Sequence, residues 1–263
     1  MTAFGPNNDV AIWTRVGRYL GDALSLPNAG NAQLQRSSRY GDSNVLPVSA
    51  KSFGACLEGS QFFTRSPTQG TGIASIAALA TFTATSPFII VQNNNPVGGR
   101  DVILDKLKLI CTAAGTSGTD MQWATKTDTI PRFTSGGSGG NNTALSSILQ
   151  GPFPLNTGSP SQSQALIYAG ALVATADSSA AKVLESGKIR TTIPVVNEQI
   201  TWGFGTTEEQ MDGIAIATAT AMQKFISHVP VVIAPGHTFL FHYWCASQSA
   251  ASSFEVMLSH IER

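Results

Sequence analysis

Hydrophobic and turn-forming residues follow one another in short blocks over residues 230–263. Two runs of β-branched, aromatic and aliphatic side chains flank Pro235-Gly236, and a third run covers residues 254–263. Pro fixes φ at one turn position and Gly permits a positive φ at the next, so this dipeptide predicts a turn between two strands. Because each block is too short for the apolar period of a long helix, residues 230–263 are predicted to supply buried strands to a β-sheet core.

The clearest alternation of apolar and polar positions covers residues 101–112. Leu107, Leu109 and Cys111 fall on one face of an extended chain, and two lysines fall on the other. This pattern is typical of an antiparallel strand with one buried face. Cys111 is therefore expected to be buried. The other residues predicted to be mainly buried are Leu107, Leu109, Phe239, Phe241, Val256 and Leu258.

Blocks of the same kind recur through the rest of the chain without helices between them. They predict further strands at residues 52–64, 72–84, 87–93, 120–128, 164–175, 181–193 and 198–205. Strands that do not alternate with helices indicate an antiparallel sheet rather than a parallel α/β fold. The connections are long and uneven, which favours a jelly roll over a tight meander. The pattern thus predicts an all-β protein with an antiparallel, jelly-roll-like β-sandwich.

Two stretches interrupt the strand pattern, at residues 129–163 and 206–222. The first contains a Gly/Ser run at residues 135–140, which is typical of a flexible loop. Strand patterns resume after both stretches. We therefore expect both to be long loops of a single β-sandwich domain that covers residues 51–263.

Residues 1–50 precede the strand pattern and are predicted to form an N-terminal arm. Apolar residues of segment 8–25 recur near i, i+4 and i+8, which predicts a short helix, although Gly17 and Gly21 weaken it. The alternative is an irregular segment whose apolar side chains dock on a neighbouring molecule. A sandwich built from later strands offers no slot for these side chains, so their burial on a partner is expected to favour association. The predicted partner-binding residues are Ile12, Trp13, Val16, Tyr19, Leu20 and Leu24.

Charge and hydropathy narrow the classes of partner. Charged residues make up 12% of the chain, with 16 Lys+Arg and 16 Asp+Glu, so the formal net charge is zero. No general basic field attracts nucleic acid, whereas a net charge near zero favours association between protein molecules. No run approaches the roughly 18 apolar residues of a transmembrane helix, and residues 1–20 lack a signal-peptide pattern. Neither nucleic acid nor a membrane is therefore predicted as a partner.

The cysteines indicate a reducing compartment. Cys56, Cys111 and Cys245 are odd in number, and none lies in a CxxC arrangement. They are predicted to be reduced thiols of a protein that folds in a cell interior.

Motifs for metal binding, cofactor binding or catalysis are absent from the sequence. His237 and His242 lie five positions apart on one predicted strand and so point to opposite faces, and no HxH pair or HExxH box occurs. No GxSxG elbow is present, and the Gly-rich run is not followed by the GK[ST] of a phosphate loop. We therefore predict no metal site, no cofactor and no catalytic residue, and we expect that the protein is not an enzyme.

A carbohydrate-binding protein is one alternative. Trp123, Trp202 and Trp244 are candidates for a sugar-stacking platform, together with the two long loops. Burial of these residues in the core is favoured, because sandwich cores commonly contain strand tryptophans.

A hydrolase is another alternative. Glu208, Glu209 and Asp212 offer the acidic pair that glycoside hydrolysis requires. A solvated acidic loop is favoured, because Gly and Thr residues flank these positions.

Several segments of the chain resemble virion structural proteins of tailed bacteriophages. The small β-sandwich proteins of this group share a strand, Asn-Pro, Gly, strand core and a late turn followed by an aromatic strand. The segments that carry the resemblance are Arg15-Val16-Gly17-Arg18-Tyr19, residues 55–63, residues 88–93, Asn95-Pro96-Val97-Gly98-Gly99-Arg100-Asp101-Val102, Val231-Val232-Ile233-Ala234-Pro235-Gly236 and Ile261-Glu262-Arg263.

The resemblance implies a capsid cement or decoration protein that stabilises the phage shell and has no enzymatic activity. It implies a homo-oligomer, often a trimer, whose other partner is the major capsid protein. The corresponding location is the virion, assembled in the host cytoplasm. The alternative role within this group is a receptor-binding or carbohydrate-binding protein of the tail or head fibre.

Overall fold

The computed structural model describes residues 35–37, 43–45, 51–75, 81–142, 144, 147–205 and 223–263. The chain divides into two compact units, Met1–Lys51 and Ser52–Arg263. In the first unit, β1 (Gln35–Ser37) and β2 (Ser43–Val45) form an antiparallel hairpin within the stretch predicted as an arm. The predicted helix at 8–25 and the six predicted partner-binding residues lie outside the described residues.

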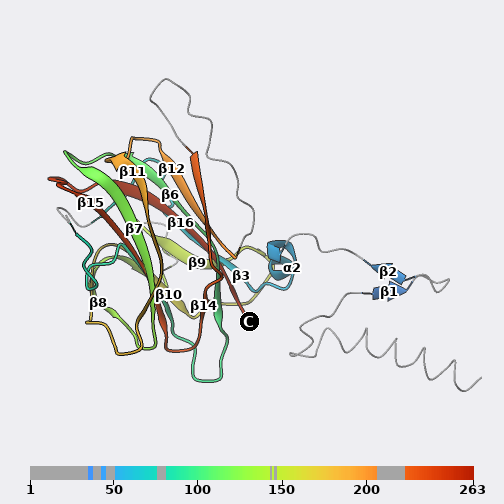
Figure 1. Cartoon of the computed structure of the whole chain (residues 1–263). Coiled ribbons are helices and arrows are strands. Elements are labelled where there is room, and N and C mark those ends of the chain that lie inside the picture. Colours follow the sequence, from blue (N-terminus) through green and yellow to red (C-terminus); the bar gives the residue numbers. More distant parts are fainter. Residues whose placement is uncertain are drawn as a thin grey trace, which may run out of the picture. The chain divides into compact units, whose positions relative to one another are not determined.

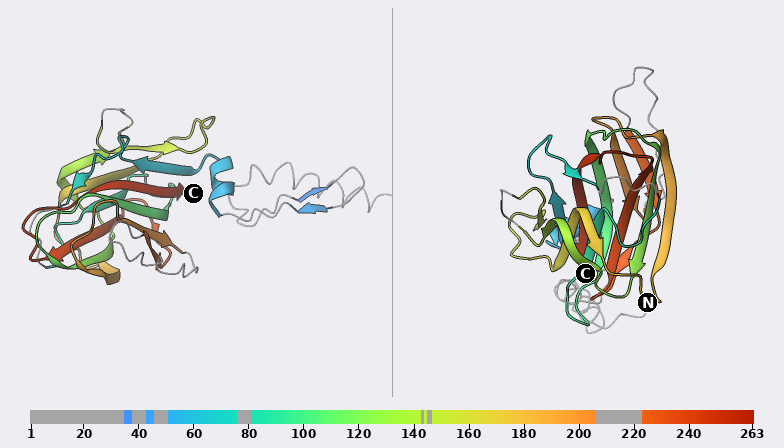
Figure 2. Two further views of the ribbon diagram at one scale, coloured as in Figure 1. Left: turned by 90° about the horizontal axis from the view of Figure 1, so that it is seen from above. Right: turned by 90° about the vertical axis from the view of Figure 1, so that its left-hand side faces the viewer.

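The second unit is a sandwich of two sheets (Figure 1, Figure 2). The six-stranded sheet has the order β11 (Lys182–Thr192), β7 (Thr119–Asp128), β15 (Thr238–Ala246), β5 (Ile89–Asn93), β10 (Ala165–Ala174) and β8 (Phe133–Gly140). The eight-stranded sheet has the order β13 (Gln223–His228), β12 (Gln199–Phe204), β6 (Val102–Ala113), β16 (Ser253–Glu262), β3 (Gln61–Arg65) and β9 (Gln150–Pro154). Its two short strands are β4 (Ile73–Ala74), which pairs with β16, and β14 (Val232–Ile233), which pairs with β6.

The predicted antiparallel β-sandwich is confirmed. The paired strands run antiparallel except β12 and β13, which are parallel. The residues predicted to be mainly buried are fully inaccessible to solvent: Leu107, Leu109, Phe239, Phe241, Val256 and Leu258.

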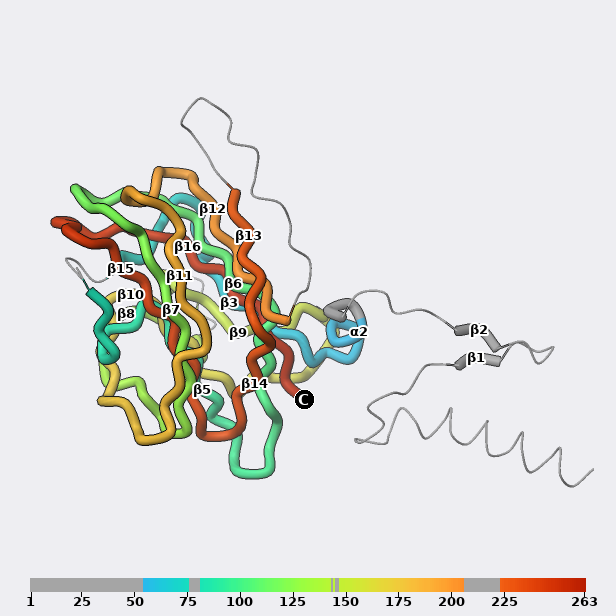
Figure 3. The backbone as a smooth tube through the Cα atoms, in the orientation of Figure 1, coloured from blue at the N-terminus to red at the C-terminus, as the bar shows by residue number. Residues whose placement is uncertain are grey.

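The last two strands of the chain occupy the middle of the two sheets. β15 lies between β7 and β5, and β16 lies between β6 and β3. The short segment after β15 carries the chain from one sheet to the other (Figure 3). Every residue of β15 except Ala246 is buried, so the closing strands do supply the core, as predicted.

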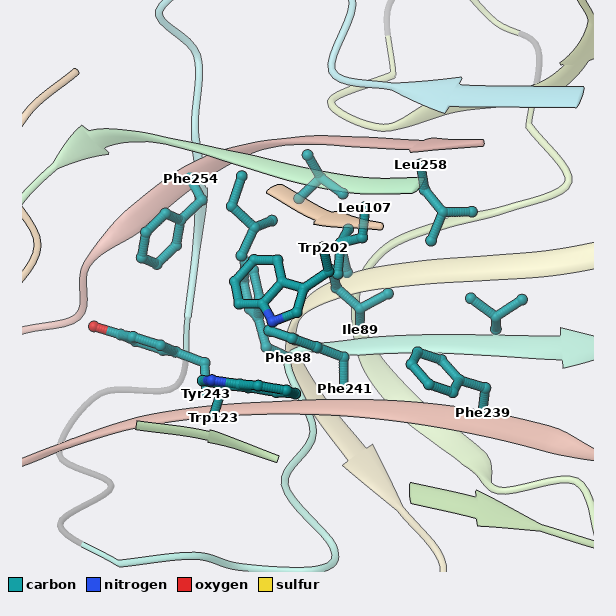
Figure 4. Packing of buried hydrophobic residues seen from close by; sticks show 14 of the residues in the cluster. Phe88, Ile89, Leu107, Trp123, Trp202, Phe239, Phe241, Tyr243, Phe254 and Leu258 are labelled. Carbon is teal, nitrogen blue, oxygen red and sulfur yellow. The ribbon is translucent and has the colours of Figure 1, made fainter. Parts of the chain in front are cut away.

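Aromatic side chains from both sheets meet between these strands (Figure 4). Trp202 of β12 lies edge-on to Phe241 of β15, with ring centroids 4.7 Å apart, and Trp123 of β7 lies 5.7 Å from Trp202. Phe254 of β16 lies 5.2 Å from Tyr243 of β15 in a similar edge-on arrangement. Each such pair contributes about 0.5–1.5 kcal/mol beyond the burial of its surface. These contacts hold the two sheets face to face.

The prediction of a strand at residues 52–64 is wrong for the first half of this stretch. That half lies in a short helix, α2 (Lys51–Leu57), and the strand β3 begins only at Gln61. The helix ends at Leu57, and the φ of +71° at Gly59 then allows the N–H of Ser60 to donate to the carbonyl of Ala55 at 2.9 Å. Glycine at this position terminates helices because it adopts a positive φ at little cost.

Two further elements differ from the sequence-based expectation. Among the described residues of the strand predicted at 72–84, which exclude 76–80, the two residues of β4 form a strand, and Thr83–Ser86 form a turn. The edge strand β13 was not predicted. Its partner β12 is parallel to it, and the connection between them, residues 206–222, lies outside the described residues.

The Gly/Ser run predicted as a flexible loop is the edge strand β8. Gly136 and Gly139 both have positive φ values, +87° and +128°. A Cβ atom on Gly139 would lie 2.1 Å from the carbonyl oxygen of Ile167 in β10, and one on Gly136 would lie 2.3 Å from that of Ala171. The glycines are therefore required by the close approach of β10, a constraint that the local sequence does not reveal.

Substitution of Gly139 by Ala is expected to lower the free energy of unfolding by about 2 kcal/mol or more, because the new Cβ strains β8 and collides with β10. Chemical denaturation of the two proteins measures this difference. Gly158→Ala is the matched control, since its Cβ would meet nothing closer than 3.5 Å, and its stability should change by less than about 0.5 kcal/mol. Equal effects of the two substitutions would contradict the close-approach explanation.

Candidate functional site

The outer face of the six-stranded sheet carries a cluster of charged and titratable side chains, all of them buried except Asp177, which is 36% exposed. Side chains alternate along β15, so Phe239 and Phe241 point into the core while Leu240 and His242 point to the opposite face. On that face lie the members of what we call the outer cluster: Lys126, Asp128, Arg132, Asp177 and His242. They come from β7, β15 and two connections.

Arg132 links these segments. Its Nη1 donates to Asp128 Oδ2 at 2.7 Å and to Asp177 Oδ1 at 2.8 Å. Its Nε donates to the carbonyl of Thr175 at 2.8 Å, and its Nη2 donates to the carbonyl of Ala84 at 3.3 Å. The guanidinium has no solvent exposure, so its charge is balanced entirely by these partners.

Both carboxyl groups of the cluster are held in the ionised form. Burial opposes ionisation of Asp128, but hydrogen bonds from Ser178, Arg132 and Thr129 outweigh it and lower the pKa of this carboxyl to about 2. For Asp177, burial is likewise outweighed by hydrogen bonds from Lys126 and Arg132, so its pKa is lowered. Both groups are therefore ionised at neutral pH, and neither is a proton donor there.

His242 is the exceptional member of the outer cluster. Its side chain is 1% exposed, and neither ring nitrogen makes a well-formed hydrogen bond to a described residue, although the backbone of Ser86 lies near enough to favour the protonated ring. Burial lowers the pKa of His242, the positive charge of Lys126 lowers it further, and the result is about 4. The ring is therefore neutral at physiological pH.

A second buried cluster joins Ser163, His260 and Glu262, the residue types of a hydrolytic triad. In such a triad the serine and the carboxylate contact different ring nitrogens of the histidine. Here Ser163 Oγ lies 3.3 Å and Glu262 Oε1 lies 3.4 Å from the same atom, Nε2, and Ser163 donates its hydroxyl to Glu262. None of the three side chains is more than 2% exposed. The arrangement cannot activate the serine.

The role of this second cluster is structural. The Glu262 carboxylate accepts hydrogen bonds from the backbone N–H groups of Gln164 at 3.1 Å and Ala165 at 3.3 Å. Burial opposes its ionisation, but His260 and Ser163 outweigh this and lower the pKa of Glu262. The carboxylate thus joins the end of β16 in one sheet to the start of β10 in the other.

The three strand tryptophans lie in buried positions. Trp123 and Trp202 are 5% and 0% exposed and belong to the core between the sheets, as predicted, whereas Trp244, 9% exposed, is buried against Phe82 on the outer face. They offer no exposed platform on which a sugar ring can stack. The acidic residues of the hydrolase alternative, Glu208, Glu209 and Asp212, lie outside the described residues.

The histidines do not converge on a metal site. Within the ranges that the structure describes, no group of three His, Cys, Asp or Glu side chains is arranged to hold a metal ion. The Nε2 atom of His228 instead forms a hydrogen bond with Thr125 Oγ1 at 2.8 Å. Its Nδ1 atom lies 2.8 Å from the carbonyl oxygen of Val229. Burial lowers its pKa, so it is a neutral side chain that helps to close the edge of the sandwich.

The three cysteines are free thiols. Cys111 and Cys245 are buried, which confirms the prediction for Cys111, and burial raises the pKa of the Cys111 thiol to about 12. Such a thiol is unreactive at neutral pH. Cys56 on α2 is only partly buried.

Searches against protein-family models, curated proteins and solved structures found no match to this chain. Among the described residues, no helix has the length and hydropathy needed to cross a membrane. The two buried clusters were not predicted, because their members are far apart in the sequence and form no local motif.

Asp128→Asn is expected to lower the free energy of unfolding by about 3 kcal/mol at neutral pH, because it leaves the buried Arg132 partly uncompensated. The folded pKa of Asp128 lies below its ordinary value of 3.8. Its contribution to stability is therefore complete above that value and is lost as the pH falls towards 2. Denaturation curves between pH 2 and 7 test both statements.

The control for this substitution is Asp120→Asn. Asp120 forms a solvent-exposed ion pair with Lys188, and such pairs contribute about 0–1 kcal/mol. If Asp120→Asn destabilises the protein as much as Asp128→Asn, the buried cluster has no special role in stability.

Proposed function

We propose that this chain is a non-enzymatic virion structural protein of a tailed bacteriophage, acting as a capsid cement or decoration protein. It binds the shell through its N-terminal arm and through contacts between its own copies. Its partners are further copies of itself, as a trimer, and the major capsid protein, and it acts in the virion after assembly in the host cytoplasm.

The division of the chain into two units is the observation that supports this proposal most directly. The unit Ser52–Arg263 contains the closed core, and the segment with the arm's apolar side chains belongs to the other unit, Met1–Lys51. The sandwich core is complete from its own strands, because its central residues are fully buried by one another. An apolar arm attached to such a domain is suited to binding a neighbouring molecule.

The chemistry of the described residues also favours a binding role over catalysis. Asp128 and Glu262 are buried carboxylates whose hydrogen-bond partners lower their pKa values, and the arrangement of Ser163, His260 and Glu262 cannot activate a nucleophile. The free thiols agree with folding in a reducing cytoplasm.

Deletion of residues 1–50 tests the proposal. We expect the thermal unfolding transition of the sandwich to remain largely unchanged, because its core contains none of these residues, while oligomerisation weakens by at least tenfold. Calorimetry and light scattering over a range of concentrations measure the two effects. Ser substitutions at Trp13 and Leu20 should weaken oligomerisation in the same direction, whereas Ala substitutions at the polar arm residues Asn28 and Asn31 should not.

If the truncated protein fails to fold, the arm belongs to the core of its own domain. If it folds and associates with unchanged affinity, the arm is not the contact, and the proposed mode of assembly is wrong.

A further inference from the structure

A short segment covers His242 on the outer face of the six-stranded sheet. We call this segment, Thr81–Ser86, the flap. Its Phe82 ring lies 4.8 Å from the His242 ring and 5.6 Å from the Trp244 ring, measured between centroids. Phe82 is 39% exposed, whereas His242 and Trp244 are almost completely buried. The flap therefore separates two aromatic side chains from water.

The flap is held to the sheet by few contacts. The N–H of Ala174 donates to the carbonyl of Thr85 at 2.9 Å, and Arg132 donates to the carbonyl of Ala84. The ammonium of Lys126 lies 5.6 Å from the centroid of the Phe82 ring. Two of these three contacts come from cations of the outer cluster, so the position of the flap depends on the electrostatics of that cluster.

Charged groups face His242 from several elements. β7 contributes Lys126, the β7–β8 connection contributes Arg132 with its partner Asp128, and the β10–β11 connection contributes Asp177. The flap itself contains no titratable residue. With His242 neutral, the two cations and two carboxylates balance.

Acid acts on His242 before it acts on the carboxylates. The pKa of Asp128 is about 2, so this group stays ionised when the pH falls to 4, and hydrogen bonds from Lys126 and Arg132 lower the pKa of Asp177 despite its partial burial. Protonation of His242 then adds an uncompensated positive charge to a buried site beside Lys126. In the closed arrangement neither ring nitrogen makes a well-formed hydrogen bond, and the backbone of Ser86, which favours the protonated ring, does not outweigh burial and Lys126. Movement of the flap would give the charged ring water as a partner.

We propose that the flap is an acid-sensitive cover, which opens when His242 is protonated and exposes an aromatic surface formed by Phe82, His242 and Trp244. Because the pKa in the closed state, about 4, lies below the ordinary value of 6.5, the closed state is fully stable above pH 6.5. Its stability is lost progressively as the pH falls from 6.5 to 4. The difference between the two pKa values corresponds to a change of up to about 300-fold in the opening equilibrium.

Hydrogen exchange of the full chain, measured by mass spectrometry between pH 7 and pH 4 and corrected for intrinsic rates, tests this proposal. The reporters are the N–H of Ala174, which donates to the flap, and the N–H of Ser86, which donates to Thr83 within it. Their protection should fall by at least tenfold below pH 5.5. Peptides from β16 should remain protected, which distinguishes opening of the flap from global unfolding.

Substitutions identify the titrating group. In His242→Gln and in His242→Phe the flap amides should stay protected from hydrogen exchange down to pH 4. If one of the two variants does not fold, the other is enough for the test. Lys126→Met removes the neighbouring cation and so raises the pKa of His242 in the closed state towards 6.5; the acid-induced loss of protection should therefore become smaller. His237→Gln, at a partly exposed histidine, is the control and should behave as the native chain. Protection of the flap that does not change between pH 7 and 4, or that falls equally in the His242 variants, would overturn the proposal.

Discussion

The packing of β15 against β16 is the constraint on which the rest of the structure depends. Each strand occupies the middle of its sheet, so burial of one requires the presence of the other. Phe241 and Tyr243 on β15 meet Trp202 and Phe254 from the opposite sheet. The other strands of these two sheets pair outward from β15 and β16, and the edges of the sheets are formed by the strands farthest from them.

The two polar clusters connect parts of the sandwich that the packing of β15 against β16 leaves unjoined. The two sheets must be joined at their ends and covered on their outer faces without leaving charges unpaired. Glu262 joins the end of β16 to the start of β10, and Arg132 joins two connections and the flap to β7. Removing one partner of a buried ion pair lowers the stability by more than the intact pair adds to it. These residues therefore determine which arrangement of the loops is stable, while their net contribution to the stability of the fold is small.

The sequence predicted the fold where local pattern and burial agree. β6 alternates between a core face and an outer face, so Leu107, Leu109 and Cys111 were identified as buried from their spacing alone. The Gly/Ser run of β8 predicted a flexible loop. Its glycines are required by the close approach of the β10 backbone, which the neighbouring residues in the sequence do not indicate. The outer cluster was not predicted for the same kind of reason: Lys126 and His242 are far apart in the sequence and meet only after β7 has paired with β15.

The central functional claim is that this domain is a building unit which associates through its arm. The mass of the purified full-length protein in solution, measured by light scattering, tests it most directly. The account predicts an assembly of several copies, with a trimer at three times the chain mass of 27.6 kDa. A protein that remains a single 27.6 kDa chain at every concentration, alone and in the presence of phage shells, would contradict it.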